Sequence, residues 1–569
     1  MIRSVLAATK LMPRVPRGMV VAEHPLGAEV GAQILKRGGN AVDAAVATAF
    51  AMTVVEPFMS TIAGGGTMLI YLAKRGETVA LDFNVQAPAA CHERIYELGE
   101  GVATDLFAWR KVAGDANTYG HRSVAVPGSV AGLCLALERY GTMELADVTA
   151  PAIALARDGF VPDWYQALTM AIHAQELLPF PETARTYLRD GHYIHRPPTI
   201  GEGDRTCFPD LARSLELIAK EGPAAFYSGA IAQAIHEEMR SHEGYLTQED
   251  LAAYQVRVSE PLRGHYRGLD VAFSPGATGG ITALQILNTL AAFPSRDICF
   301  DSPGGLHLRA EAVRYAFQDR FTFLGDPASI KAPWAGLASA GYGAAVAGRI
   351  SPTGPRSRRS APEPWGFENA SPPPRRPRPS RAGGDDCTTH IGAVDRQRNM
   401  VSLTHTAVSL FGSRVVVPGT GILLSNGMLW FDPEPGKPSS VGPGKRALVN
   451  MVPVLAFRRG EPHLTLGAPG GRKIISAIPQ VLSNLADLKL PPQAAIEAPR
   501  IHTEGGDLWV DDRVGEDALK ALKRMGHPVV PRHEDLTTLF FSRPVAIRVT
   551  KDGLEAGLDH LRAAAAAGY

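Results

Sequence analysis

The stretch Cys387-Thr388-Thr389-His390-Ile391-Gly392-Ala393-Val394-Asp395 is the most informative part of this sequence. It follows a Pro- and Arg-rich run, residues 350–386, and it opens a segment patterned like buried strands. If the chain cleaves itself between Cys387 and Thr388, Thr388 gains a free α-amine beside its hydroxyl. Such an amine, with a reference pKa of about 7.7–8.0, can take the hydroxyl proton near neutral pH. The pattern therefore favours a threonine nucleophile, with an ordinary strand-initial threonine as the alternative.

The bulk composition is that of a globular protein with a large core. The chain has 569 residues, 45% of them hydrophobic and 20% charged, with a formal net charge of +1. This balance shows no global bias toward nucleic acid. The five cysteines are widely spaced and form no CxxC pair, which argues against a disulfide framework or a zinc site made of cysteine pairs.

The sequence offers no membrane or export signal. No window contains 18 uncharged apolar residues, so no membrane span is expected. The N-terminal apolar run is broken by Lys10 and Pro13 before it could serve as the core of a signal peptide. We therefore expect a cytoplasmic location rather than a periplasmic one.

The two halves of the chain differ in pattern. Residues 27–38 and 40–55 have helical patterns that end at glycine or before proline, residues 129–260 are mostly helical, and residues 304–323 form an amphipathic helix. From Thr388 onward, short strand-like runs separated by Gly, Pro and Asn dominate. The sequence thus predicts an α+β protein with a helix-rich first part and a strand-rich second part.

Residues 350–386 differ in kind from both halves. They are dense in Pro, Arg and Ser and poor in aliphatic residues, so they cannot bury enough surface to offset the entropy of ordering. We expect an exposed, flexible linker here. A docking peptide or a nucleic-acid-binding arm is the alternative interpretation.

Two further motifs could support a threonine nucleophile. Thr406 lies on the presumed strand after Thr388, where its hydroxyl could hydrogen-bond the nucleophile, although threonine is also common in strands for its propensity alone. Gly470 and Gly471 follow a strand and precede a helix, where consecutive N–H groups can bind an oxyanion. A glycine turn needed for packing is the alternative. The scattered histidines have no metal-ligand spacing, so neither a metal nor another cofactor is expected.

Taken together, many motifs along the chain resemble the γ-glutamyltranspeptidase family of N-terminal-nucleophile hydrolases. The resemblance covers nearly the whole sequence. It rests on His24-Pro25, GGNAVDAAVA (38–47), VVEP (54–57), IAGGGTM (62–68), SVAVPGSVAGL (123–133), ALARDGF (154–160), LGDP (324–327), CTTHIGAVD (387–395), GILLSNGM (421–428), GPGKR (442–446), GAPGG (467–471) and a terminal GY (568–569).

The resemblance implies a four-layer αββα sandwich, made as a precursor that cleaves itself between Cys387 and Thr388. A large segment, 1–387, and a small segment, 388–569, would remain associated. It also implies roles for the motifs already described. Thr388 would be the nucleophile in both self-cleavage and turnover, Thr406 would support it, and the amides of Gly470 and Gly471 would form the oxyanion hole.

The departures from the family pattern concern substrate recognition. The arginine that grips the substrate α-carboxylate is replaced by Asn84, and the aspartate that holds the α-ammonium is replaced by Trp430. A family asparagine falls at Val408, and a Ser-Ser pair becomes Val449-Asn450. An amide is no electrostatic substitute for a bidentate guanidinium. These changes suggest a more apolar acyl site.

The sequence therefore predicts an amidohydrolase that forms an acyl-enzyme on Thr388 and releases the acyl group to water or an amine acceptor. Its substrate would be a small-molecule amide with a non-standard acyl group; no nucleic acid or membrane partner is expected. Two alternatives remain: a genuine γ-glutamyltransferase or glutathione hydrolase, in which Asp432 would hold the ammonium, and a catalytically silent binding protein of the same fold.

Overall fold

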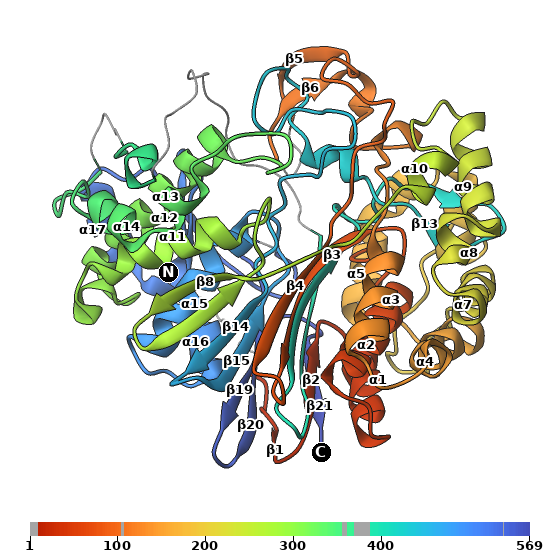
Figure 1. Cartoon of the computed structure of the whole chain (residues 1–569), viewed down its shortest axis with the longest axis horizontal. Coiled ribbons are helices and arrows are strands. Elements are labelled where there is room, and N and C mark those ends of the chain that lie inside the picture. The colour runs from red at the N-terminus through yellow and green to blue at the C-terminus, as the bar shows by residue number, and fades with distance from the viewer. Residues whose placement is uncertain (1–8, 104–106, 356–360, 369–386, 539) are drawn as a thin grey trace.

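The computed structural model describes residues 9–103, 107–355, 361–368, 387–538 and 540–569. Two seven-stranded sheets lie face to face at the centre, and helices cover both outer faces (Figure 1). All the strand pairs within these two sheets are antiparallel. Within the described ranges, no helix is both long and apolar enough to cross a lipid bilayer.

The first sheet, called sheet I, carries the segment around Thr388. In spatial order its strands are β21 (Ala565–Gly568), β2 (Met19–Ala22), β10 (Thr389–Val394), β11 (Met400–Thr406), β3 (Gly65–Leu72), β4 (Glu77–Phe83) and β7 (Arg257–Ser259). The second sheet, sheet II, has the order β1 (Arg14–Val15), β20 (Gly553–Leu558), β19 (Val545–Thr550), β15 (Glu461–Gly467), β14 (Val454–Arg458), β9 (Leu269–Phe273) and β8 (Leu262–Tyr266).

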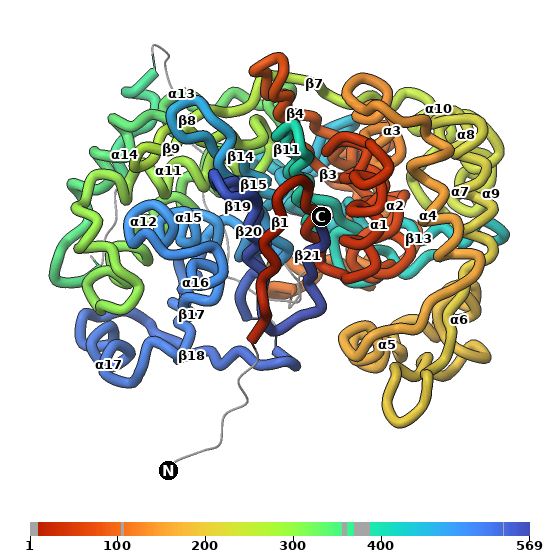
Figure 2. Tube along the Cα trace, turned by 90° about the horizontal axis from the view of Figure 1, so that it is seen from below, coloured from red at the N-terminus to blue at the C-terminus, as the bar shows by residue number. Residues whose placement is uncertain are grey.

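Helices α1, α2 and α3 pack on sheet I, whereas α11, α15 and α16 pack on sheet II (Figure 2). The helices that precede β7 in the chain are α1 (Pro25–Lys36), α2 (Ala41–Val55), α3 (Ser129–Tyr140), α4 (Leu145–Asp158), α5 (Trp164–Leu177), α6 (Pro181–Tyr187), α7 (Pro209–Glu221), α8 (Ala224–Tyr227), α9 (Ala230–Ser241) and α10 (Gln248–Ala252). The others are α11 (Gly280–Ala291), α12 (Pro303–Phe323), α13 (Trp334–Ala338), α14 (Ala340–Ala347), α15 (Lys473–Ala486), α16 (Pro492–Glu497) and α17 (Glu516–Arg524).

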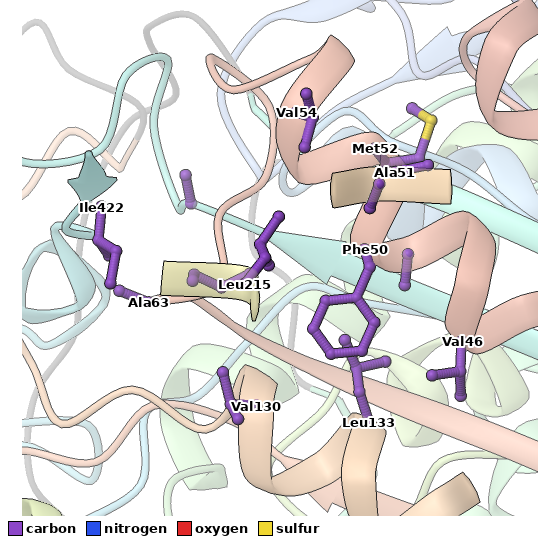
Figure 3. Close-up of a cluster of buried hydrophobic side chains, with 14 of the residues drawn as sticks. Val46, Phe50, Ala51, Met52, Val54, Ala63, Val130, Leu133, Leu215 and Ile422 are labelled. Carbon is purple, nitrogen blue, oxygen red and sulfur yellow. The ribbon is translucent and has the colours of Figure 1, made fainter. Parts of the chain in front are cut away.

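Three apolar cores hold the four layers together. One lies between sheet I and its helices, where Phe50 of α2 lies beside Leu133 of α3 (Figure 3). A second joins sheet II to α11, α12 and α15, and a third fills the space between the two sheets. The predicted αββα sandwich is thus confirmed, because each sheet buries both of its faces.

The helix that lines sheet I illustrates how the sequence specifies the fold. Every residue of α2 is buried, which matches its nearly uninterrupted apolar sequence. Asn40 caps its first turn: the Asn40 side chain accepts from the amides of Val42 and Asp43, and Asp43 accepts from the Asn40 amide. The helix predicted for residues 40–55 is confirmed, as are those predicted from residues 27–38 and 304–323.

Strands from either side of Thr388 alternate within both sheets. In sheet I, β10 and β11 lie between β2 and β3, and β21 pairs with β2. In sheet II, β14 pairs with β9, and β20 pairs with β1. Segments 1–387 and 388–569 therefore share their sheets and their cores. The division at Thr388 itself stays a prediction.

The expectation that residues 350–386 are exposed does not hold for Trp365, while their role as a flexible linker stays a prediction. Trp365 belongs to a short 3₁₀ turn, η4 (Pro364–Phe367), and its side chain is buried, with only 3% exposed. The Lys331 ammonium lies 5.7 Å from the centre of its ring. The aromatic residue supplies the apolar surface that the surrounding Pro and Arg residues lack. Residues 356–360 and 369–386 lie outside the described residues.

Candidate functional site

Thr388 lies at the start of β10, opposite the end of β11. The register pairs Thr389 with His405, which places Thr388 beside Thr406. The Thr388 Oγ1 lies 3.4 Å from the Thr406 Oγ1 and donates a hydrogen bond to the carbonyl oxygen of Cys387. Thr388 is only 4% exposed. The predicted pair of threonines is therefore brought together, around the peptide bond that would be cut.

The Thr406 hydroxyl is oriented by its surroundings. Its oxygen accepts from the Val408 amide at 2.8 Å, which directs the hydroxyl proton elsewhere. The Cys387 carbonyl oxygen, 3.2 Å away, is the acceptor. Thr406 thus acts as a positioned donor to the carbonyl that Thr388 would attack.

The three glycines 64–66 allow β3 to approach this end of β11. A Cβ on Gly64 would lie 2.2 Å from the Thr406 carbonyl oxygen, and one on Gly66 would lie 2.6 Å from the Thr404 carbonyl oxygen. No side chain fits in that space. These glycines serve packing, and the packing holds the threonine pair in place.

The Cys387 side chain is buried against the turn after α2. Its Sγ lies 2.9 Å from the carbonyl oxygen of Phe58 and 2.8 Å from that of Met59. Burial raises the pKa of the Cys387 thiol well above its usual value, so the thiol stays protonated and donates. The residue before the scissile bond is thus anchored through its side chain.

The loop after Thr406 has an unusual backbone. Val408, Phe411 and Arg414 have φ values of 86°, 57° and 64°, which are left-handed. For a β-branched residue such as Val408 this conformation costs about 1–3 kcal/mol. The Ala407 amide donates to the Met59 carbonyl oxygen and the Phe411 amide donates to that of Phe58, which keeps the strained loop against the turn holding Cys387.

Gly470 and Gly471 lie in the turn between β15 and α15. Their φ values, 130° and 51°, are positive, so this turn favours glycine for its conformation. The preceding Pro469 carbonyl oxygen accepts from the Ser542 hydroxyl at 2.6 Å and from the Arg543 amide at 3.1 Å. Neither glycine amide has an acceptor in the part of the chain that the structure describes. Two N–H groups in a fixed turn thus remain free to bind an oxyanion.

The turn also lies close to the nucleophile's strand. A Cβ on Gly467 would meet the His390 ring at 2.0 Å, so the start of this turn packs directly on a residue two positions after Thr388. Hydrogen bonds between the sheets reinforce the contact, since the Ser402 hydroxyl donates to the Leu466 carbonyl oxygen at 3.1 Å. The oxyanion-hole role of Gly470 and Gly471 stays a prediction.

Three of the five predicted substrate-binding residues share one apolar cluster. Val408, Trp430 and Val449 are all buried in it. Other members include Val85, Phe107, Trp109, Met428 and Phe431. Because the Val408 amide bonds Thr406, this cluster adjoins the threonine pair.

Of the two predicted asparagines, Asn84 is hydrogen-bonded within the protein at both ends of its side chain, whereas Asn450 is bonded through its side-chain oxygen alone. The Asn84 side chain donates to the Ala447 carbonyl oxygen at 2.9 Å and accepts from the Val85 amide at 2.8 Å. The Asn450 carbonyl accepts from the buried Arg320 guanidinium at 3.1 Å. The Asn450 amide nitrogen is buried without a partner among the described residues. Asn84 therefore has no free group with which to replace a substrate-binding arginine.

Asp432, the residue that could have replaced the ammonium-binding aspartate, is also occupied. The Lys437 Nζ lies 3.3 Å from its carboxylate, and the Glu434 amide donates to it at 3.0 Å. A carboxylate already paired with a lysine gains little from a second cation. This arrangement argues against Asp432 as an ammonium anchor.

The histidines near the site are structural. Burial lowers the pKa of His390 to about 3 and that of His405 to about 4, so both rings are neutral at physiological pH. His390 Nδ1 lies 2.9 Å from the Thr404 hydroxyl, and His405 Nε2 lies 2.7 Å from the Ser129 hydroxyl. They join neighbouring strands and helices rather than reach the scissile bond.

Sequence reasoning missed a buried group of acids behind Cys387. Glu56 begins the turn that anchors Cys387, and its Oε2 has no hydrogen-bond partner in the described part of the chain. Burial, with the nearby carboxylates of Glu23 and Asp163, raises the pKa of Glu56 well above its usual value. The signal in the sequence was the motif VVEP (54–57), which contributed to the resemblance without indicating a role for Glu56.

Arg472, directly after the glycine pair, was missed as well. Its guanidinium lies 4.9 Å from the centre of the Phe107 ring and 5.1 Å from that of Trp109. It also forms an ion pair with the buried carboxylate of Glu504. Burial alone would raise the pKa of Glu504, but Arg472 and His502 outweigh it and lower that pKa to about 2. This arginine links the glycine turn to the apolar cluster.

Comparisons with known proteins show which family and which relatives this sequence is similar to. The sequence profile of the family described as Gamma-glutamyltranspeptidase matches residues 27–569. The "Acylase ACY 1 proenzyme" of Pseudomonas sp. (strain SE83) is 38% identical over 516 residues, which cover 90% of this chain and 87% of that protein. The "Glutathione hydrolase proenzyme" of Escherichia coli (strain K12) is 36% identical over 532 residues, covering 91% and 86%.

A solved structure extends the similarity to the whole fold. The crystal structure of cephalosporin acylase from Bacillus halodurans superimposes with a TM-score of 0.85 at 27% sequence identity. The superposition covers 100% of this chain and 98% of that one. The chain is thus similar to an acylase and to a glutathione hydrolase over about nine-tenths of its length, and to the cephalosporin acylase structure over all of it.

Proposed function

Since the chain belongs to the γ-glutamyltranspeptidase family, whose members are threonine-nucleophile hydrolases and transferases, we propose that it is a self-processing amidohydrolase acting on an acyl group without the α-ammonium of glutamate. One observation carries the proposal. The Thr388–Thr406 pair surrounds the Cys387 carbonyl, while the positions that recognise a zwitterionic glutamyl group are apolar or already hydrogen-bonded.

Self-processing begins with Thr388 attacking the carbonyl carbon of Cys387. The Thr388 oxygen forms an ester with that carbonyl, the peptide C–N bond breaks, and the nitrogen keeps the proton that the hydroxyl gives up. Water then hydrolyses the ester and releases segment 1–387 as a carboxylate. Thr406 supports the step, because its hydroxyl already donates to the oxygen on which negative charge develops.

Turnover uses the same oxygen with a new base. The freed α-amine of Thr388 takes the hydroxyl proton, the oxygen attacks the substrate amide, and the amine proton passes to the leaving group. The acyl-enzyme is then released to water or to an amine acceptor. The free amides of Gly470 and Gly471 would stabilise the oxyanion in both halves of the reaction.

The apolar cluster indicates the acyl group. Trp430, Val408 and Val449 offer no charge, and Asp432 is paired with Lys437. Burying an ammonium there without a partner costs several kcal/mol. We infer an acyl group with an apolar stem.

Three p-nitroanilides of matched length test the substrate class. Pentanoyl carries no charge, glutaryl carries one carboxylate, and γ-glutamyl adds the α-ammonium. We expect kcat/KM for the pentanoyl or glutaryl compound to exceed that for the γ-glutamyl compound by at least about tenfold, from the cost of the unpaired ammonium. A γ-glutamyl compound that is turned over fastest, at a rate raised further by glycylglycine, would contradict the proposal.

Fastest turnover of the γ-glutamyl compound would instead support a genuine γ-glutamyltransferase, the alternative that the 36% identity to a glutathione hydrolase favours.

A gain-of-function variant tests the same reasoning about the missing charges. Replacing Trp430 by Asp together with Asn84 by Arg should raise γ-glutamyl turnover, because it supplies both missing charges. The catalytically silent alternative predicts that an electrophilic acyl analogue labels no residue; labelling at Thr388 removes it.

A further inference from the structure

Two histidines and a glutamate from distant parts of the chain meet near the molecular surface. Their ligand atoms all lie within 4.8 Å of one another. The His121 Nε2 lies 2.7 Å from Glu238 Oε1, and the His242 Nδ1 lies 3.2 Å from the same oxygen. The two imidazole rings are stacked, with centroids 4.2 Å apart and planes 6° from parallel.

The backbone is shaped to bring these side chains together. Glu238 and His242 are four residues apart at the C-terminal end of α9, so they lie on one face of that helix. His121 begins the short turn η2 (His121–Ser123), closed by the Ser123 hydroxyl donating to the Gly120 carbonyl oxygen at 2.7 Å. A Cβ on Gly244 would lie 3.2 Å from the His121 Cβ, so glycine permits the close approach.

An ion pair with Glu238 would need only one of the two histidines. One histidine satisfies one carboxylate oxygen, whereas here two rings converge on the same atom. Two protonated imidazoles stacked at this separation would repel each other, while two neutral imidazoles with a carboxylate form a ligand set that suits zinc. His121 and Glu238 are 13% and 16% exposed in their side chains and His242 is 52% exposed, so an ion can enter from solvent.

We propose that His121, Glu238 and His242 form a binding site for a divalent transition metal of the zinc type. Zinc bonds of about 2.0–2.2 Å in tetrahedral geometry place ligand atoms roughly 3.3 Å apart. The His242–Glu238 pair, at 3.2 Å, already has this separation, and the His121–Glu238 pair, at 2.7 Å, would have to open by about 0.6 Å. His242 Nδ1 also lies 3.0 Å from the Glu238 backbone oxygen, and binding of an ion at Nδ1 would replace that hydrogen bond. The fourth position is left for water.

The site adjoins the wall of the candidate active site. Turn η2 contacts the 3₁₀ turn η5 (Gly427–Trp430), which carries Trp430. The Gly120 amide donates to the Ser413 carbonyl oxygen at 2.8 Å, in the loop that follows Thr406. A bound ion would therefore brace the loops around the apolar cluster. Because 117 residues separate His121 from Glu238, no spacing in the sequence indicates that these side chains meet.

Metal binding to the full-length protein tests the site without reference to catalysis. After treatment with a chelator, the wild type is titrated with Zn²⁺ by calorimetry and with Co²⁺ by visible absorption. We expect one ion per chain, bound with nitrogen and oxygen ligation, and a Zn²⁺-dependent rise in Tm. His242→Ala and Glu238→Gln should weaken binding by roughly 10–100-fold or more.

The control is His265→Ala, which removes an exposed histidine that lies 2.9 Å from Asp270 but has no second histidine beside it in the described structure. This variant should bind as the wild type does. Absence of stoichiometric binding by the wild type, or equal affinity in wild type, His242→Ala and Glu238→Gln, would overturn the proposal. Because His242 is half-exposed, its replacement is expected to leave the fold intact.

Discussion

Replacing Thr406 by Val should slow self-cleavage by about two to three orders of magnitude. The change keeps the branched shape of the side chain and removes the hydroxyl that lies 3.2 Å from the Cys387 carbonyl oxygen. This hydroxyl donates to the atom that becomes negatively charged when Thr388 attacks. Loss of one donor of this kind costs about 10²–10³ in rate, or about 2.7–4 kcal/mol.

The same change has a cost in stability that must be separated from the cost in rate. The Val408 amide, 2.8 Å from the Thr406 oxygen, would be left buried without an acceptor. The expected loss in unfolding free energy is about 1–3 kcal/mol. Because this is smaller than the stability of a typical domain, the variant should fold. Circular dichroism and thermal melting check this before the rate is interpreted.

The assay follows newly made chain on denaturing gels and by intact mass, which report segments 1–387 and 388–569 as they appear. Two matched variants serve as controls. Thr406→Ser keeps the hydroxyl and should process within about tenfold of the wild type. Thr389→Val makes the same chemical change at a neighbouring buried threonine whose hydroxyl has no partner among the described residues. A folded Thr406→Val protein that matures at the wild-type rate would refute the reasoning.

Three further changes test the packing and charges around the site. Gly467→Ala places a Cβ 2.0 Å from a buried ring and should lower the unfolding free energy by about 1–3 kcal/mol or more in a denaturant melt, whereas Gly304→Ala, in open space, should be neutral or slightly stabilising. Burial raises the pKa of Glu23 from 4.5 to about 8, so between these pH values the folded state holds a proton that the unfolded state releases. The free energy of unfolding should therefore fall as pH rises from 4.5 to about 8, by up to about 1.4 kcal/mol per pH unit. Glu23→Gln should flatten this dependence of the unfolding free energy on pH. Arg472→Met leaves the buried Glu504 carboxylate without its partner guanidinium and should lower the free energy of unfolding by about 3–5 kcal/mol, as measured by thermal unfolding. Adding Glu504→Gln should restore most of this loss. Equal melting temperatures of the single and double variants would contradict the pairing.

The local elements were readable from sequence because their signals are local. Asn40 and the apolar run after it predict α2 without reference to the rest of the protein. For Thr406 the sequence alone left strand propensity as an equal explanation, and the register of β10 and β11 is what places its hydroxyl beside Thr388. The four-layer arrangement came from the resemblance, since no pattern in the sequence states which strand lies beside which.

The groups that sequence reasoning missed act across long separations. Arg472 contacts Phe107 and Trp109, which lie more than three hundred residues earlier in the sequence, so no local spacing predicts these contacts. Glu56 resembled an ordinary helix end until its burial was known. Trp365 was misjudged because a single aromatic residue can anchor an otherwise polar stretch.

The alternation of strands from both segments within each sheet has a consequence for the mature protein. Once the bond before Thr388 is broken, neither fragment holds a complete sheet, so each depends on the other for its hydrogen-bond partners. Unfolding then releases two chains, and recovery becomes a second-order encounter that slows as the protein is diluted. We expect the precursor to refold from denaturant and the nicked protein to do so poorly, so that its persistence is governed by how slowly it comes apart.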